Sequence, residues 1–287
     1  MKADKDLGSQ QHHLATTDYD LRITNLAGFI YSKLVGRHPE LNSGSNGMPK
    51  QVRHDVRLKP KLLDVGAGNG LFLKFFKNKG FEVAGYELEM ELVENIKKDP
   101  RLKEIDVRQG DITKMTGNET YDVVIASDVI EHISEDKKAL QNLWSFVKPG
   151  GRLVITVPAH LHLYGKRDKA WGHYRRYDKS VLKKRIIESI SRRHPELVSG
   201  SGEMPKQVRH DEYYEIETLT FWNIVGYFIY FLYEKILHKQ INEEMRYSKS
   251  FISKFVRAVL DSILKIENMI GGLPLGLTLV AVVKKVK

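Results

Sequence analysis

The stretch KLLDVGAGNGL, residues 61–71, joins a short apolar run to three closely spaced glycines. The apolar run predicts a buried strand, and the glycines predict a turn where a ligand can approach the backbone without meeting a Cβ atom. A helix that follows such a turn offers unpaired N–H groups to an anion. The stretch therefore predicts a nucleotide-type ligand. Dinucleotide enzymes use Gly-x-Gly-x-x-Gly at this place, but here the third glycine comes one residue early.

Strands and helices alternate outward from this stretch. We expect strands at 61–65, 82–86, 105–108, 121–126 and 152–157, and helices at 71–79, 90–98 and 135–147. Ser134 is expected to cap the last of these helices, and Pro149, Gly150 and Gly151 to end it. A further helix begins at Asp178. This alternation predicts an α/β fold with a doubly wound, Rossmann-like sheet.

The two ends of the chain add helices to this plan. Residues 18–36 are expected to form an N-terminal cap helix over the sheet edge or a ligand mouth. Strands are predicted at 213–219 and 275–286, with helices at 221–239 and 250–270 between them. We interpret residues 219–270 as a helical subregion that faces the substrate or a membrane. All 287 residues then belong to one domain.

Two segments, 37–55 and 193–211, match at sixteen of nineteen positions. They are far apart and rich in glycine, serine and charge, so they are not stacked structural repeats. They resemble translated palindromic repeats inserted in frame into bacterial genes, and we interpret both as loops. We expect their histidines not to bind a metal, because no ligand cluster accompanies them. These are His38, His54, His194 and His210.

Composition narrows the class of protein. The chain is 41% hydrophobic and has no cysteine, which excludes global disorder, disulfide-stapled folds, cysteine nucleophiles and zinc-thiolate sites. The first eleven residues lack the apolar part of a secretion signal, so we expect a cytoplasmic protein. No metal site is expected.

An uncharged aromatic segment, 219–233, is shorter than the roughly 20 apolar residues that span a bilayer. It could wall a substrate cavity, form a dimer face or lie on a membrane. Residues 219–238 are therefore our candidate for peripheral contact with the inner face of the membrane. The oligomeric state is not indicated.

The net charge of +10 is concentrated in residues 166–193, which hold eleven basic and three acidic residues. Such a run indicates either an anionic neighbour or a solvated helix face.

Polar residues follow each of the next three predicted strands. Glu87 ends the second strand, where a carboxylate can accept ribose hydroxyls. Asp111 and Ile112 follow the third, and Ser127 and Asp128 follow the fourth. The carboxyl ends of parallel strands are where open α/β sheets bind ligands, so these residues are expected to line one site.

In this order the motifs resemble class I S-adenosylmethionine-dependent methyltransferases, a group that includes the ubiquinone-type O-methyltransferases. The resemblance covers residues 18–160 best. It implies a seven-stranded sheet with an antiparallel last strand, and S-adenosylmethionine as cofactor. The site residues it implies are Asp64, Gly66, Ala67, Gly68 and Gly70 around the methionine part, Glu87 at the ribose, Asp111 and Ile112 at the adenine, and Ser127 and Asp128 beside them.

Catalysis requires alignment of the acceptor with the methyl group, and a base only if a hydroxyl proton must leave. His132 follows the fourth strand and is the first candidate, with His173 the second. His132 could instead cap or pack at the start of the following helix. The substrate side is expected after the fifth strand, where aromatic and basic residues gather: His160, Tyr164, Trp171, Arg175 and Arg176. In the alternative interpretation, Tyr174 and Tyr177 pack and Arg176 pairs with a carboxylate such as Asp178.

The leading hypothesis is a methyltransferase that acts on a small or lipid-linked acceptor, by O-methylation. Nucleic-acid methylation is an alternative, but the position after the fourth strand lacks an Asn-Pro-Pro-Tyr-type motif, so we expect no specific nucleic-acid partner. A second alternative is a cofactor-binding protein that has lost activity. A nicotinamide oxidoreductase is a distant alternative because its glycine spacing differs.

Overall fold

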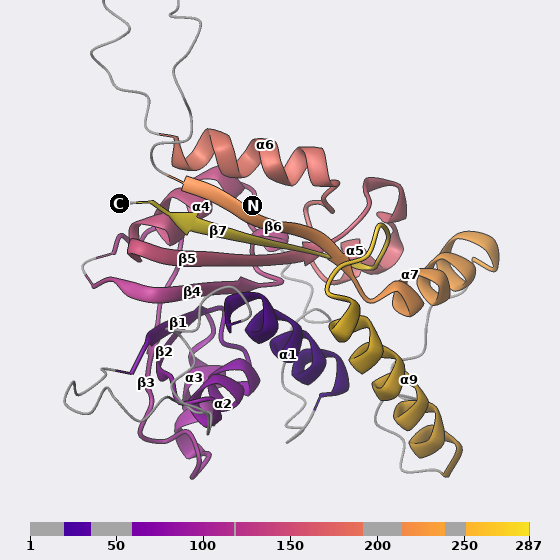
Figure 1. Ribbon diagram of the computed structural model, residues 1–287, viewed down its shortest axis with the longest axis horizontal. Helices are drawn as coiled ribbons and strands as arrows, with labels where there is room; N and C mark the ends of the chain where they lie inside the picture. Colours follow the sequence, from indigo (N-terminus) through magenta and orange to yellow (C-terminus); the bar gives the residue numbers. More distant parts are fainter. Residues whose placement is uncertain (1–19, 36–58, 118, 192–213, 239–250, 287) are drawn as a thin grey trace, which may run out of the picture.

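The computed structural model describes residues 20–35, 59–117, 119–191, 214–238 and 251–286. In these ranges seven strands form one sheet, in the order β3-β2-β1-β4-β5-β7-β6 (Figure 1). Strands β1 to β5 run parallel, whereas β7 runs antiparallel to both β5 and β6. The predicted fold class is confirmed. The strands are β1 Lys61–Val65, β2 Glu82–Glu87, β3 Asp106–Gln109, β4 Tyr121–Ser127, β5 Val147–Pro158, β6 Tyr214–Trp222 and β7 Thr278–Lys285.

Helices cover both faces of the sheet. The α-helices are α1 Leu21–Val35, α2 Leu71–Asn78, α3 Met90–Lys98, α4 Asp136–Ser145, α5 Lys166–Ala170, α6 Lys179–Ile190, α7 Ile224–Tyr230 and α9 Phe251–Ile270. Two 3-10 turns, η2 Ile130–His132 and η3 Leu161–Leu163, and a π-helical turn, η6 Phe231–Ile236, complete the described elements. The predicted additions at the N-terminus and between the last two strands are present as α1 and as α7, η6 and α9.

The core has two halves because successive strand residues point to opposite faces. On one face, Val124 and Leu153 pack with α4 and α6. On the other, their neighbours Val123 and Val154 pack with α1, α2 and Leu264 of α9. Figure 1 shows α4 and α6 on one side of the sheet and α1 and α2 on the other. Because both faces are buried, the central strands are mostly apolar.

The structure corrects the boundary between α4 and β5. Helix α4 ends at Ser145, and β5 begins at Val147, so Pro149, Gly150 and Gly151 lie inside the strand. The pairing of β5 with β4 starts at Val147, shifts register and then continues. The prediction that these three residues end the helix was therefore wrong. The cap prediction was also wrong, since Glu135 precedes the helix and makes no side-chain capping bond.

A second correction concerns the start of the helical subregion. Strand β6 continues through Phe221 and Trp222, which were predicted to be helical. Trp222 is fully buried and packs with the core on the α1 side of the sheet, which favours the strand. The chain then turns at Asn223, whose Oδ1 accepts a 2.8 Å hydrogen bond from the N–H of Gly226 and so begins α7.

Both inserted repeats, with their four histidines, lie outside the described residues, as does Tyr213. The first falls between α1 and β1 and the second between α6 and β6. In the part of the chain that the structure describes, no helix is both long and apolar enough to cross a membrane.

Candidate active site

The turn between β1 and α2 has a shape that two glycines permit. Gly66 and Gly68 have φ angles of 78° and 54°, which residues with side chains rarely adopt. The N–H groups of Gly66 and Ala67 both donate to the carbonyl oxygen of Tyr86, at 2.8 and 3.1 Å. A Cβ on Gly66 would lie 2.5 Å from Cγ2 of Val129, whereas a Cβ on Gly68 would meet nothing within 4 Å. The backbone at Gly68 therefore borders open space that a ligand could enter.

The other two loop residues implied by the resemblance face the protein interior. Ala67 is buried and packs in a cluster with Leu73 and Ile96. A Cβ on Gly70 would lie 2.8 Å from Cδ1 of Leu102. Both residues therefore shape the turn through packing.

Asp64 is a buried carboxylate without a polar partner. It is 1% exposed, and neither of its side-chain oxygens is hydrogen-bonded to any described residue. Burial, with the charge of Glu87 adding to it, raises the pKa of Asp64 to about 7. A buried carboxylate is costly unless it is paired, so a nearby cation would stabilise its charged form. The amino group of S-adenosylmethionine is such a cation, and Asp64 therefore fits the cofactor that the resemblance implies.

Glu87 connects the end of β2 to the glycine turn. Its Oε2 accepts a 2.7 Å hydrogen bond from the N–H of Gly68, and its Oε1 accepts from the N–H groups of Leu88 and Glu89 at 2.7 and 3.2 Å. A carboxylate has about four lone-pair positions, so these bonds leave room for one hydroxyl donor. This geometry fits the expected ribose contact.

Asp111 and Ile112 follow β3, as predicted. Oδ1 of Asp111 accepts from the N–H and Oγ1 of Thr113 at 2.9 and 2.7 Å, and Lys114 lies 3.1 Å from Oδ2. The hydrogen bond from the Thr113 hydroxyl is the main cause that lowers the pKa of Asp111. Ile112 is buried, and its carbonyl oxygen accepts a 2.6 Å bond from Asn142. Their contact with an adenine stays a prediction.

Ser127 ends β4, Asp128 follows it, and the two side chains contact different elements. The hydroxyls of Ser127 and Thr156 share a 2.8 Å hydrogen bond between β4 and β5. Oδ2 of Asp128 accepts a 2.6 Å bond from Arg22 of α1. The sequence did not single out Arg22, because nothing local distinguishes it from other surface arginines.

The two candidate bases, His132 and His173, lie side by side although they are far apart in sequence. Their rings meet edge to face with centroids 4.6 Å apart. Glu131 lies with them, fully buried and with neither carboxylate oxygen hydrogen-bonded to a described residue. Burial, together with the charge of Asp128, raises the pKa of Glu131. Sequence reasoning missed Glu131, although its position next to His132 was a signal.

One atom from each of Glu131, His132 and His173 lies within 4.8 Å of the others, a spacing that would also suit a metal ion. The expectation of no metal site therefore stays a prediction.

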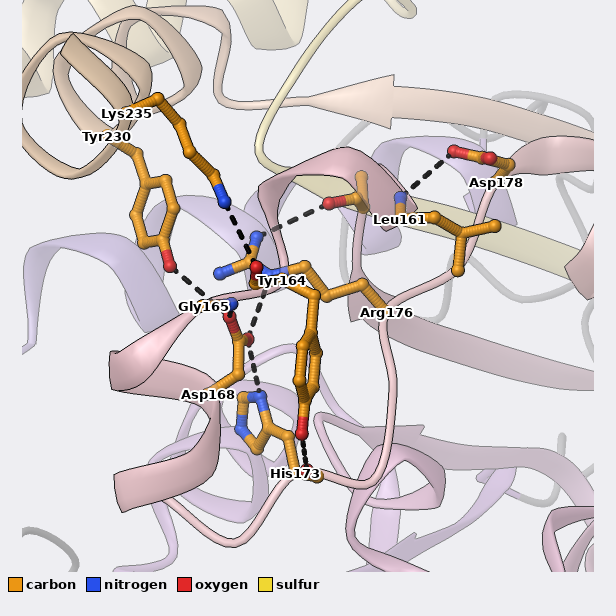
Figure 2. Close-up of polar contacts among 10 residues, drawn as sticks. Leu161, Tyr164, Gly165, Asp168, His173, Arg176, Asp178, Tyr230 and Lys235 are labelled. Atoms are coloured by element: carbon orange, nitrogen blue, oxygen red, sulfur yellow. Dashed lines mark hydrogen bonds and ion pairs between the residues drawn. The ribbon is translucent and has the colours of Figure 1, made fainter.

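The predicted substrate residues divide into buried and accessible ones. Arg176 is buried and donates from Nε to Asp168 at 2.8 Å and from Nη1 to the carbonyl of Ala159 at 3.3 Å (Figure 2). The expectation that Arg176 pairs with a carboxylate is thus confirmed, and the partner is Asp168 and not the suggested Asp178. Tyr164 helps to fix the backbone at His173, because its hydroxyl donates to the carbonyl oxygen of His173 at 2.9 Å.

Trp171 and Arg175 are partly accessible. Trp171 stacks under the guanidinium of Arg167, 4.2 Å from the ring centroid, and lies edge-on to His173. Arg175 pairs with Asp136 at 2.8 Å and donates to the carbonyl of Ser134. The Arg175 guanidinium therefore already has two partners within the protein.

His160 is nearly buried and has a φ angle of 66°, unusual for a residue with a side chain. Its ring stacks on Phe221 with centroids 4.6 Å apart, and Tyr227 of α7 lies edge-on at 5.0 Å. Nζ of Lys179 also lies over the Phe221 ring, 4.6 Å from its centroid. His160 thus joins β5 to the helical subregion.

The two tyrosines of the alternative interpretation behave differently. Tyr177 is buried and its hydroxyl donates to Asp136 at 3.0 Å, so the expectation that it packs is confirmed. Tyr174 is 59% exposed, so the same expectation was wrong for it.

Comparisons with known proteins agree with this architecture. A family model described as a methyltransferase domain matches residues 35–194. The ubiquinone biosynthesis O-methyltransferase of Rickettsia canadensis (strain McKiel) is 33% identical over 102 residues, covering 34% of this chain and 43% of that protein. The enzyme of the same name from Coxiella burnetii (strain Dugway 5J108-111) is 26% identical over 112 residues, covering 38% and 48%. The chain thus spans about half the length of the curated relatives it matches.

Among solved structures, a candidate sarcosine dimethylglycine methyltransferase from Galdieria sulphuraria is similar over most of the chain. The TM-score is 0.52 at 13% identity, with 92% of this chain and 85% of that chain covered. At this identity the likeness concerns the fold alone.

Proposed function

This chain belongs to the methyltransferase domain family and is an S-adenosylmethionine-dependent enzyme, and on that premise we propose that it methylates a hydroxyl group of a small or lipid-linked acceptor. The curated relatives named as ubiquinone biosynthesis O-methyltransferases support oxygen as the acceptor atom. A phenol that carries an apolar chain is the acceptor class we favour.

The observation that carries the proposal is the contact between two imidazoles, one of which follows the segment that packs on the glycine turn. Val129 packs closely on Gly66 of that turn, and His132 follows three residues later in η2. His173 comes from a different part of the chain and lies against the His132 ring. Neutral imidazoles at the carboxyl edge of the sheet can accept a hydroxyl proton near neutral pH.

S-adenosylmethionine supplies, when bound, an electrophilic methyl group. Gly66 and Gly68 would let the backbone come close to the bound cofactor. Asp64 and Glu87 would supply negative charge and hydrogen-bond acceptors to it. The proposed catalytic groups are His132 and His173, which take up the acceptor's proton. The remaining contribution of the protein is to align the acceptor and exclude water.

An apolar surface supports a lipid-linked acceptor and a peripheral membrane contact through residues 219–238. Phe228 of α7 is 57% exposed, and Leu232 and Ile236 of η6 are also exposed. Contiguous apolar surface of this kind commonly marks an interaction site. We place the membrane contact on this part of α7 and η6.

The basic run gives less support to a nucleic-acid substrate. Arg175 and Arg185 both pair with Asp136, Arg176 pairs with Asp168, and Lys184 pairs with Glu188. These cations are engaged within the protein, which reduces the charge available for phosphates. We therefore do not propose a nucleic acid as the acceptor.

Calorimetric titration tests the proposal at its first step. The purified chain is titrated with S-adenosylmethionine, with its demethylated product and with NADH as the control. We expect micromolar binding of the first two and none of NADH. An acceptor screen that begins with lipid-linked phenols then follows. A folded chain that binds the cofactor but methylates no hydroxyl acceptor, and instead methylates RNA or an amine, would contradict the proposal.

A further inference from the structure

Asp168, in α5, is a buried carboxylate surrounded by four polar partners, three from residues 165–176 and one from α7 (Figure 2). The N–H of Gly165 donates to Oδ2 at 2.9 Å, and Arg176 donates from Nε to Oδ1 at 2.8 Å. The hydroxyl of Tyr230, from α7, reaches Oδ2 at 3.3 Å. The fourth partner is Nδ1 of His173, which lies 3.0 Å from Oδ1. Asp168 is thus held in one position by groups that do not depend on a bound acceptor.

The state of Asp168 decides which nitrogen of His173 carries the proton. Burial acts to raise the pKa of Asp168, but the bonds from His173 and Arg176 outweigh it, and the pKa lies below the ordinary value. An ionised carboxylate can only accept hydrogen bonds, so Nδ1 of His173 must be the donor. In the neutral ring this leaves Nε2 as the basic nitrogen.

Nε2 is also the nitrogen that remains available. No other described residue forms a hydrogen bond with it, while the ring lies against His132. The groups that face this ring are Glu131 and His132 from η2, Trp171, which lies edge-on to it, and Asp168 itself. The backbone is fixed as well, because the N–H of His173 donates to the carbonyl oxygen of Asp168 at 2.8 Å and its carbonyl accepts from Tyr164.

We propose that Asp168 is a positioning residue for methyl transfer, which holds His173 as the Nε2 base for the acceptor hydroxyl. This inference rests on the proposed function and extends it by one residue. As the acceptor oxygen bonds to the methyl carbon and the carbon–sulfur bond breaks, the hydroxyl proton passes to Nε2. The resulting imidazolium is stabilised by Asp168 and later releases the proton to water.

The first test reads the tautomer of His173 directly in the full chain. Nitrogen-15 NMR of histidine-labelled protein is expected to show His173 with a protonated Nδ1 and an unprotonated Nε2, with the resonance assigned by His173→Gln. The readout does not require turnover, so it stands even if no hydroxyl acceptor is ever found. An unprotonated Nδ1 would overturn the proposal.

The second test uses turnover. Asp168→Asn keeps the size of the side chain and removes its charge, and we expect kcat to fall roughly 10- to 1,000-fold, a part of the roughly 100- to 10,000-fold that a general base contributes. Cofactor affinity should stay unchanged, and KM should change much less than kcat. Asp178→Asn is the matched control, because Asp178 accepts a 3.2 Å bond from the N–H of Leu161 and bonds no histidine (Figure 2). It should retain full kcat.

A double-mutant cycle separates positioning from general support of the fold. If Asp168 acts through His173, adding Asp168→Asn to His173→Gln should slow the reaction no further. Multiplied effects of the two changes would mean that Asp168 acts independently of His173, and would overturn the proposal. Loss of activity in a chelator, restored by a divalent cation, would also overturn it, since Nε2 would then be a metal ligand. If Asp168→Asn does not fold, the NMR measurement still decides.

Discussion

Arg22 of α1 donates a 2.6 Å hydrogen bond from Nη2 to Oδ2 of Asp128, a residue 106 positions further along the chain. Asp128 lies at the end of β4, next to the proposed cofactor site, and has a φ angle of 55°. The bond attaches the N-terminal helix to the segment that continues into His132. Because the side chains are 30% and 26% exposed, the pair contributes about 1 kcal/mol at most. Its main consequence is where α1 sits relative to the site.

Arg22→Ala should therefore loosen the attachment of α1 beside the site while lowering the free energy of unfolding only slightly. We expect the Kd for S-adenosylmethionine to rise roughly fivefold, the equivalent of about 1 kcal/mol. Calorimetry measures this. Lys61→Ala is the control, since its pair with Glu82 is exposed and distant from the site. An unchanged Kd for Arg22→Ala would mean that α1 does not influence the cofactor.

Asp64 makes stability depend on pH in a definite direction. Its pKa is about 7 in the folded chain against an ordinary value of 3.8, so the folded state binds more protons between these values. Stability is then greatest below about pH 4 as far as Asp64 contributes, and it is lost as the pH rises towards 7. Each pKa unit corresponds to about 1.4 kcal/mol.

Melting temperatures measured from pH 4.5 to 8 test this. We expect Asp64→Asn, which cannot ionise, to show a smaller fall in Tm over this range, by roughly 2–4 °C for each kcal/mol involved. The cofactor should reduce the slope in the unsubstituted chain, because its cation stabilises the ionised carboxylate. Parallel profiles for the two chains would contradict the role of Asp64.

Gly68→Arg should abolish cofactor binding while the fold is kept. The glycine has φ 54° and borders open space, so an arginine there would fill the space proposed for the ligand. Gly150 offers a matched control, since it has φ 81° and its Cβ would also meet nothing within 4 Å. Gly150→Arg carries the same backbone cost and should bind S-adenosylmethionine normally. Equal loss in both variants would point to misfolding.

His132→Ala should leave cofactor affinity intact and slow turnover at least about tenfold, because His132 lines the proposed acceptor site. Single-turnover kinetics on an acceptor that the screen identifies provides the measurement. His162→Ala serves as the comparison, since His162 is exposed and its Nε2 lies 3.4 Å from the hydroxyl of Tyr227. Full activity of His132→Ala would remove His132 from the catalytic groups.

The exposed apolar surface on α7 and η6 should bind lipid. We expect Phe228→Glu combined with Leu232→Glu to reduce sedimentation with phosphatidylglycerol vesicles severalfold, because charges oppose burial in the interface. Leu88→Glu is the matched control, an equally exposed apolar residue on another part of the molecule. Vesicle binding that persists in the double variant would place the membrane contact elsewhere.

Local sequence determined the parts of this protein whose structure depends on near neighbours. Strand β1, the glycine turn and helix α3 lie where the pattern predicted them, because apolar periodicity and glycine conformation act over a few residues. The order of polar residues after successive strands was also readable, since parallel strands bring their carboxyl ends to one edge. That was enough to predict the fold class and a nucleotide-type ligand, while the family resemblance carried by these motifs implied the cofactor.

Only the tertiary structure decided which distant groups meet. Trp222 belongs to a strand because its side chain packs in the core on the α1 side of the sheet. Arg176 pairs with Asp168 although Asp178 is closer in sequence. The contact between His132 and His173 likewise depends on how the segment after β5 folds back. Hydrogen-bond partners over such separations are chosen by the packing of whole elements, and a linear pattern of residues carries no record of that choice.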